Sequence, residues 1–167
     1  MCNLDLRRRA ESYARKHRLR IVDRLGGGTD GEVWTTNRKT AVKVFQSQKN
    51  YDMEVGCYQR LRDRGVKNIG QFTIPRLIQS DGTLLAIEME IVTPPCLLDF
   101  GKAYLDGEPE HSNETWAEHY ATQREIWEDK FNEVQSVLWT LRQLGIYYRD
   151  PKPGNIMFAP SPRSTNT

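Results

Sequence analysis

The sequence predicts an α+β protein in which an antiparallel sheet with one helix comes first and a mainly helical part follows. The first 92 residues alternate short β-branched stretches with turns rich in glycine, asparagine and aspartate, which is typical of antiparallel strands. Within them, Tyr51 to Arg64 has apolar residues at helical spacing. Later in the chain, Trp116 to Leu144 carries a long apolar stripe at the same spacing.

The predicted elements follow in order along the chain. A short basic helix over Arg7–Arg20 leads into the sheet, and Gly65 ends the helix Tyr51–Arg64. Turn residues at Asn37-Arg38-Lys39 and at Ser80-Asp81-Gly82 separate neighbouring strands. The predicted strands are Arg20–Leu25, Glu32–Thr36, Thr40–Phe45, Ile74–Ile78 and Leu84–Ile91.

Thr93-Pro94-Pro95 interrupts this pattern and is interpreted as a linker between two domains, residues 1–92 and 93–167. In the second domain we expect a short helix over Leu97–Leu105, a polar loop over Asp106–Asn113 and one long helix over Trp116–Leu144. Gly145 ends that helix, and Ala159–Thr167 is expected to be a frayed tail.

Composition excludes several classes of protein. The net charge is +2, from 24 basic and 22 acidic residues, so charge alone indicates no nucleic-acid binder. No apolar run approaches membrane-spanning length, and the three cysteines form no disulfide framework. We therefore expect a soluble cytoplasmic protein. The basic run Arg7–Arg20 is interpreted as a solvated helix face, with a patch for nucleic acid, lipid or a partner as the alternative.

A glycine-rich turn lies between the first two predicted strands. Gly26, Gly28 and Gly31 have the G-x-G-x-x-G spacing, and Val33 follows. Glycines let backbone N–H groups approach a triphosphate closely. Strands on both sides argue against a dinucleotide-binding turn, which a helix should follow. Asp30, near the tip, would be unfavourable beside phosphates unless a cation offsets its charge.

Two further segments carry charged or polar side chains that are candidates for a functional site. Lys43 lies between Val42 and Val44, and an ammonium in so apolar a strand needs a partner. Near the C-terminus, Asp150-Pro151-Lys152-Pro153-Gly154-Asn155 combines a carboxylate, an ammonium and an amide in one tight segment.

Taken in this order, the glycine turn, Ala41-Val42-Lys43 and the Asp-x-Lys-x-x-x-Asn segment resemble the ATP site of the eukaryotic-type (Ser/Thr) protein-kinase-like family. The resemblance covers a small lobe and the start of a large one, so it implies a truncated large lobe. It also implies ATP and Mg²⁺ as ligands. Lys43 would pair with the α/β-phosphates and with Glu54, for which Asp52 is the alternative.

The remaining site residues are implied by the same resemblance. Asp150 would be the catalytic base, Lys152 would neutralise the transferred phosphoryl group, and Asn155 would hold the metal. Met89 would be the gatekeeper, and the backbone of Glu90 and Val92 would bind the adenine. The nucleotide would also contact Gly26, Gly28, Gly31, Val33 and Ala41.

The sequence departs from the family pattern at several positions. Tyr148 stands where a histidine is usual, and Pro151 where a leucine is usual. Between Asn155 and Thr167 no Asp-Phe-Gly supplies the usual metal aspartate. The triplet Asp99-Phe100-Gly101 occurs upstream instead. We interpret it as the start of the short helix and a chance resemblance, with a rearranged metal ligand as the alternative.

The predicted function is ATP binding in a kinase-type cleft, with phosphotransferase activity through Asp150. The alternatives are a pseudokinase or interaction module without turnover and, more remotely, a basic nucleic-acid-binding protein. The sequence names no substrate. In the helix Trp116–Leu144 the stripe would lack the later helices that cover it, which predicts a homodimer or a partner protein along it. The stripe consists of Trp127, Phe131, Val134, Leu138 and Leu141.

Overall fold

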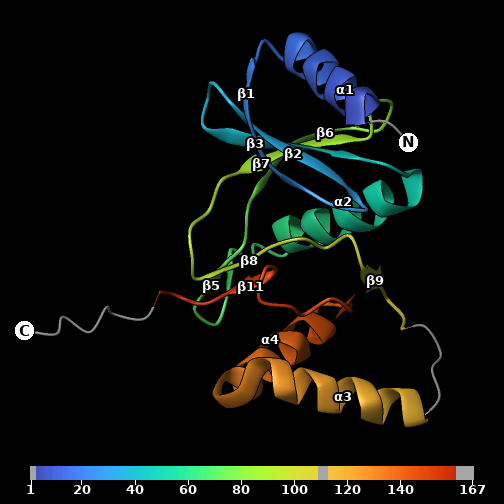
Figure 1. The fold of residues 1–167 in the computed structure, drawn as a ribbon, viewed down its shortest axis with the longest axis vertical. Coiled ribbons are helices and arrows are strands. Elements are labelled where there is room, and N and C mark those ends of the chain that lie inside the picture. The colour runs from blue at the N-terminus through green and yellow to red at the C-terminus, as the bar shows by residue number, and fades with distance from the viewer. Residues whose placement is uncertain (1–2, 109–112, 161–167) are drawn as a thin grey trace, which may run out of the picture.

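A five-stranded antiparallel sheet forms the first part of the protein in the computed structural model, which describes residues 3–108 and 113–160. Figure 1 shows this sheet between a helix above and a helix below it. The predicted α+β class is confirmed. In sheet order the strands are β1 (Ile21–Gly27), β2 (Gly31–Thr36), β3 (Thr40–Phe45), β7 (Ala86–Glu90) and β6 (Leu77–Asp81).

The sheet is covered on both faces, by α1 (Asn3–Lys16) and by α2 (Gln48–Asp63), so it carries two helices rather than one. On the α1 side, Tyr13 packs in a cluster with Val42 and Val44 of β3. Alternate side chains of a strand point to opposite faces, so the β3 residues between them face α2. This alternation explains why β3 has apolar residues on both faces and why Lys43 is turned toward the α2 side.

The basic residues of α1 are partly used within the fold. The Arg9 guanidinium donates to the carbonyl oxygens of Leu84 and Phe45, and Lys16 Nζ lies 2.6 Å from Asp81 Oδ2. Such contacts attach the helix to the sheet. They leave less free positive charge than the sequence suggests, in line with a solvated helix face.

The helix predicted over Leu97–Leu105 is wrong. The chain forms β8 (Cys96–Leu97), a turn and β9 (Ala103–Leu105) instead. Asp99, with φ 59°, has a left-handed conformation that an α-helix excludes. The backbone groups of this segment bond to distant strands: β8 to β11 (Ile156–Met157) and β9 to β10 (Ile146–Tyr148).

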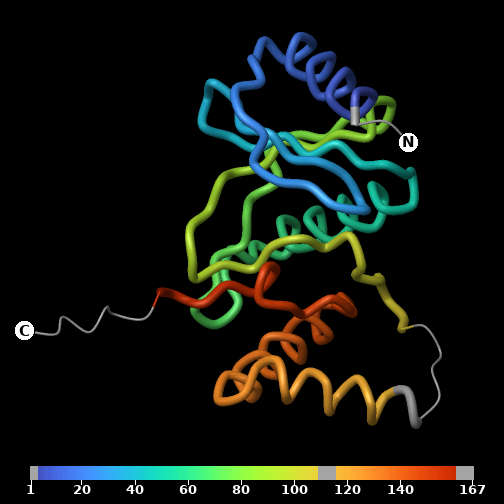
Figure 2. The backbone as a smooth tube through the Cα atoms, in the orientation of Figure 1, coloured from blue at the N-terminus to red at the C-terminus, as the bar shows by residue number. Residues whose placement is uncertain are grey.

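Strands from both sides of residue 92 share one sheet. Its order is β11-β8-β5-β4, with β4 at Asn68–Ile69 and β5 at Phe72–Thr73. One apolar cluster also includes both Phe45 of β3 and Leu141 near the C-terminal end. The division at residue 92 therefore stays a prediction. Figure 2 shows the yellow trace of residues 93–105 crossing between α2 and the red C-terminal segment.

The single helix predicted over Trp116–Leu144 is also wrong. It is divided into α3 (Asn113–Trp127), a 3₁₀ turn (Glu128–Lys130) and α4 (Phe131–Gln143). Glu128 has φ 48°, which ends the α-helical path and lets α4 fold back along α3 (Figure 1). No helix within the described residues is long and apolar enough to cross a membrane.

The apolar stripe on this helical segment is covered by the chain itself. Trp127, Phe131, Val134 and Leu141 are buried, and Leu138 is partly buried against the same core. The expectation that the stripe lies in water is therefore wrong, and association along it loses its physical basis. Residues 109–112 of the predicted polar loop and 161–167 of the predicted tail lie outside the described residues.

Candidate functional site

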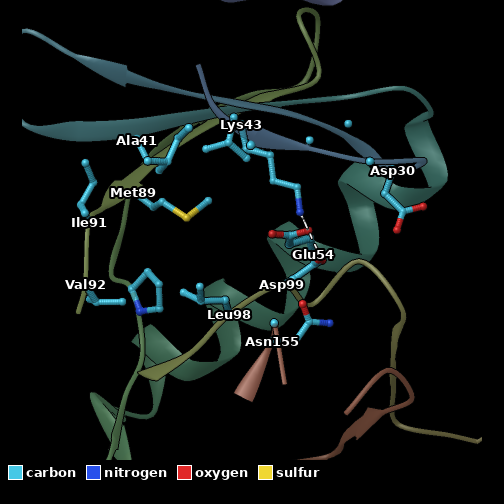
Figure 3. Close-up of a pocket in the computed structure, with 18 of the residues that line it drawn as sticks. Asp30, Ala41, Lys43, Glu54, Met89, Ile91, Val92, Leu98, Asp99 and Asn155 are labelled. Atoms are coloured by element: carbon cyan, nitrogen blue, oxygen red, sulfur yellow. Dashed lines mark hydrogen bonds and ion pairs between the residues drawn. The ribbon is translucent and has the colours of Figure 1, made fainter. Parts of the chain in front are cut away.

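A cleft of about 500 Å³ opens between the sheet and the segments that follow residue 92. Figure 3 shows Lys43 reaching from the sheet toward Glu54 and Asp99, with Asn155 below them. Most residues that the sequence singled out line this one space. They are Gly26, Gly28, Gly31, Val33, Ala41, Lys43, Glu54, Met89, Glu90, Val92, Lys152 and Asn155.

The glycine turn closes one side of the cleft. The amide nitrogen of Gly28 donates to the carbonyl oxygen of Gly31 at 3.0 Å, which closes the tip between β1 and β2. A Cβ at Gly31 would collide with the carbonyl oxygen of Val44 on β3. Asp30 is held at the tip by the side-chain amide of Asn50, 2.9 Å away. The turn therefore presents backbone and a fixed carboxylate to the cleft.

Lys43 and Glu54 form a buried ion pair at the back of the cleft. Lys43 Nζ lies 2.6 Å from Glu54 Oε2, and 3.2 Å from Asp99 Oδ1. Glu54 is on the inner face of α2, whose first turn is capped by the Ser47 side chain accepting from Asn50 N. The alternative carboxylate, Asp52, is exposed and accepts from Gln48. Glu54 Oε1 is buried without a hydrogen-bond partner in the described part of the chain.

The Lys43 ammonium thus pairs with two carboxylates, those of Glu54 and Asp99. Burial and these mutual charges shift the pKa values of all three groups. Burial raises the pKa of Glu54 to about 7; Lys43 opposes this shift, and Asp99 and Asp30 add to it. Burial also opposes the charged form of Lys43, but Glu54 and Asp99 outweigh it and raise the lysine's pKa. For Asp99, desolvation is outweighed by Lys43 and the Gly101 amide, and its pKa is lowered.

We expect Glu54 to make stability depend on pH near neutrality. Its folded-state pKa of about 7 exceeds the ordinary value of 4.5, so the fold holds this proton more tightly than the unfolded chain. The resulting stability is full below pH 4.5 and is lost as pH rises through 7. At 1.36 kcal/mol per pKa unit, the loss between pH 5 and 8 is about 2 kcal/mol.

Urea unfolding of the wild type and of Glu54→Gln across this pH range measures the effect. The difference in unfolding free energy between the two proteins should change by about 2 kcal/mol, with the wild type losing stability as pH rises. A pH-independent difference would mean that Glu54 is ionised throughout the range.

The edge of the cleft nearest the linker is built from β7 and the residues after it. Met89 pairs with Ala41 of β3, and its sulfur lies 3.9 Å from the Tyr58 hydroxyl. The amide nitrogen of Glu90 donates to Arg76 O. Val92 follows the end of the strand and lines the cleft together with Ile91. This edge presents apolar side chains to the cleft, and the Glu90 N–H is already used within the sheet.

Asp150 lies just outside the residues that line the cleft but contacts three of them. Its Oδ2 is 2.9 Å from Lys152 Nζ and 3.7 Å from Lys102 Nζ, and the side-chain Nδ2 of Asn155 donates to its main-chain oxygen at 2.9 Å. The hydrogen bond to Asp150 raises the pKa of Lys152. The Trp127 indole N–H donates to Pro151 O at 3.1 Å, which attaches the segment that follows Asp150 to α3.

Sequence reasoning missed Lys102 and misplaced Asp99. Both line the cleft, on the turn between β8 and β9. Asp99 does not begin a helix, so the predicted helix start at this triplet is wrong. The local sequence provided little signal for the turn, because only Tyr104 of the run Ala103–Leu105 favours a strand.

Phe100 fixes this turn from below. It is fully buried, and its ring meets Tyr58 of α2 at 5.1 Å and Tyr148 of β10 at 5.4 Å, both edge to face. The Tyr148 hydroxyl donates to Leu98 O at 2.6 Å. Three segments far apart in the sequence are thereby joined directly beneath Asp99 and Asp150.

Comparison with solved structures gives distant matches to aminoglycoside phosphotransferases. The streptomycin–ATP ternary complex of APH(2")-IIa aligns with a TM-score of 0.42 and 17% identity, over 84% of this chain and 42% of that one. ADP-bound APH(2'')-Ib gives 0.41 and 15%, over 81% and 51%. The gentamicin complex of APH(2")-IIa gives 0.41 and 16%, over 86% and 52%.

This chain therefore spans about half the length of the structures it matches. No family model and no curated protein matches its sequence. At these scores the structural likeness is distant, and the function proposed below depends on the cleft itself.

Proposed function

We propose that this protein binds ATP with Mg²⁺ in the cleft and transfers the terminal phosphoryl group to a hydroxyl acceptor. The observation that carries the proposal is the buried Lys43–Glu54 pair, 2.6 Å apart, which shares one cleft with Lys152 and Asn155. A buried ammonium that is held by a carboxylate and still reaches an open cleft is well placed to bind an anion.

The two ends of the cleft suit the two ends of a nucleotide. Apolar side chains near the linker, among them Val33, Ala41 and Leu98, suit a flat base, and the main chain of Glu90 and Val92 offers it hydrogen-bonding groups. At the other end, Lys43 and the backbone of the glycine turn would hold the phosphates.

A magnesium ion fits the donors on the lower side of this cleft. Among residues 3–108 and 113–160, no three His, Cys, Asp or Glu side chains could hold a metal unaided. Mg²⁺ is commonly held by one or two protein oxygens together with substrate phosphates. Asn155 would supply an amide oxygen. When bound, the metal would neutralise charge on the phosphates during transfer.

Asp150 and Lys152 would then serve the transfer itself. Asp150 would orient the acceptor hydroxyl and take its proton as the acceptor oxygen bonds to the γ-phosphorus and ADP leaves. Lys152, held beside Asp150 at 2.9 Å, would stabilise the negative charge of the phosphoryl group. Lys102, which also contacts the Asp150 carboxylate, would help to hold this base in place.

Replacing Lys43 with methionine tests the proposal. Methionine keeps much of the apolar stem but removes the charge, so ATP·Mg²⁺ should bind roughly 10- to 100-fold more weakly, as expected for a lost charge-assisted hydrogen bond. Isothermal titration calorimetry of both proteins measures the two dissociation constants.

Lys67→Met is the matched control, because Lys67 is exposed and lies outside the cleft. It should leave the affinity unchanged. A wild-type protein that binds no ATP at millimolar concentration, or a Lys43→Met variant with wild-type affinity, would contradict the proposal.

A further inference from the structure

We infer that Asp99 is a metal ligand of this cleft and acts together with Asn155. The inference rests on the proposed function and adds to it a carboxylate from the β8–β9 turn, which the chain reaches well before the segment that contains Asn155. Four features of the fold support it: strand pairing, local contacts, charge balance and an unsatisfied oxygen.

Strand pairing places the two residues next to each other. Leu97 of β8 is the register partner of Ile156 of β11, and the strands are antiparallel. The Leu98 amide nitrogen donates to the carbonyl oxygen of Asn155 at 2.7 Å, which extends the pairing by one residue. Asp99 is the next residue along, one position past the partner of Asn155, and both residues line the cleft (Figure 3).

The contacts of Asp99 orient its carboxylate. Its Oδ1 accepts from the Gly101 amide nitrogen at 3.1 Å and from Lys43 Nζ at 3.2 Å. Asp99 itself has the left-handed conformation, φ 59°, which an aspartate adopts more readily than most residues and which turns the chain here between β8 and β9. Its side chain is 34% exposed, so it remains open to a ligand in the cleft.

Charge balance at the Lys43 end of the cleft favours a cation. Glu54 and Asp99 share the single ammonium of Lys43, and the Asp30 carboxylate points to the same region, close to Gly101. The phosphates of ATP would add further negative charge. A divalent cation between Asp99 and the phosphates would offset this repulsion, as small hard cations do at carboxylate–phosphate sites.

The second oxygen of Glu54 is an independent observation, because it could accept a hydrogen bond from a donor that enters the cleft. Glu54 is 1% exposed, yet its Oε1 has no hydrogen-bond partner within the described residues. A buried carboxylate oxygen without a partner is costly. A hydrated metal held at Asp99 would bring water molecules into this region as donors.

Titrating ATP in EDTA and in Mg²⁺, with the wild type and with Asp99→Asn, tests the inference. In EDTA the variant should bind ATP at least as well as the wild type, because a negative charge near the phosphates is gone. The tightening produced by Mg²⁺ should fall at least about tenfold in the variant, the range seen when metal sites lose a supporting group. Asp106→Asn, the same change outside the cleft, should keep the full effect of Mg²⁺.

A second measurement needs no variant, in case Asp99→Asn does not fold. Mn²⁺ added to the wild-type protein with a non-hydrolysable ATP analogue should broaden the amide NMR signals of Gly101 and Asn155 at the lowest metal concentrations. Broadening that spares both signals would overturn the inference, as would an equal effect of Mg²⁺ on the wild type and Asp99→Asn. Wild-type protein that binds ATP but fails these tests refutes only the role of Asp99, whereas no ATP binding at all refutes the proposed function as well.

Discussion

Truncating Phe100 to alanine is expected to lower the free energy of unfolding by about 3–5 kcal/mol, the usual cost of removing a buried aromatic ring. Phe100 is fully buried and packs edge to face on both Tyr58 and Tyr148, so its removal leaves a cavity beneath the β8–β9 turn. These neighbours come from two separate elements, α2 and β10, and cannot easily move together to fill the space. Chemical denaturation of both proteins at one pH measures the loss.

Tyr120→Ala is the comparison for this experiment. The Tyr120 ring contacts Phe131 at 4.9 Å but is 51% exposed, so its truncation should cost about 1 kcal/mol or less. Phe100→Leu, which fills part of the cavity, should lie between the two. Equal losses for Phe100→Ala and Tyr120→Ala would show that the β8–β9 turn is not held by this ring.

The sequence predicted the elements whose signals are local. Strand β3 was predicted with its observed bounds, because β-branched residues and the Asn37–Lys39 turn mark it. The helix α2 was predicted a turn short at its start, since the capping role of Ser47 was not recognised. For the site, the order of the motifs along the sequence was enough to select residues that line a single cleft.

The errors involve structure that depends on distant partners. Residues 97–105 resemble a short helix in isolation, but they bond to β10 and β11, which come some fifty residues later in the chain. The residues around Glu128 do not predict its left-handed conformation, because neither glycine nor proline occurs there. The wrong helix prediction also hid the position of Asp99, because the pairing of Leu97 with Ile156 is what brings Asp99 into the cleft.

Replacing Asp150 with asparagine is expected to lower the rate of phosphoryl transfer by roughly 10²- to 10⁴-fold, the contribution of a positioned general base. ATP affinity should stay within about threefold, because Asp150 lies outside the residues that line the cleft. The amide keeps the size of the side chain but cannot take a proton. Release of ADP, with water or the protein itself as acceptor, measures the rate in the wild type and the variant.

Asp63→Asn is the control for this change, because Asp63 is exposed at the end of α2, where it contacts Arg62. It should release ADP at the wild-type rate. If Asp150→Asn did the same, another group would be the base. Wild-type protein that binds ATP·Mg²⁺ and releases no ADP would support nucleotide binding without turnover. The Lys102–Asp150–Lys152 cluster would then be a structural ion-pair group, and Asp150→Asn would lower stability while ATP affinity stays within about threefold.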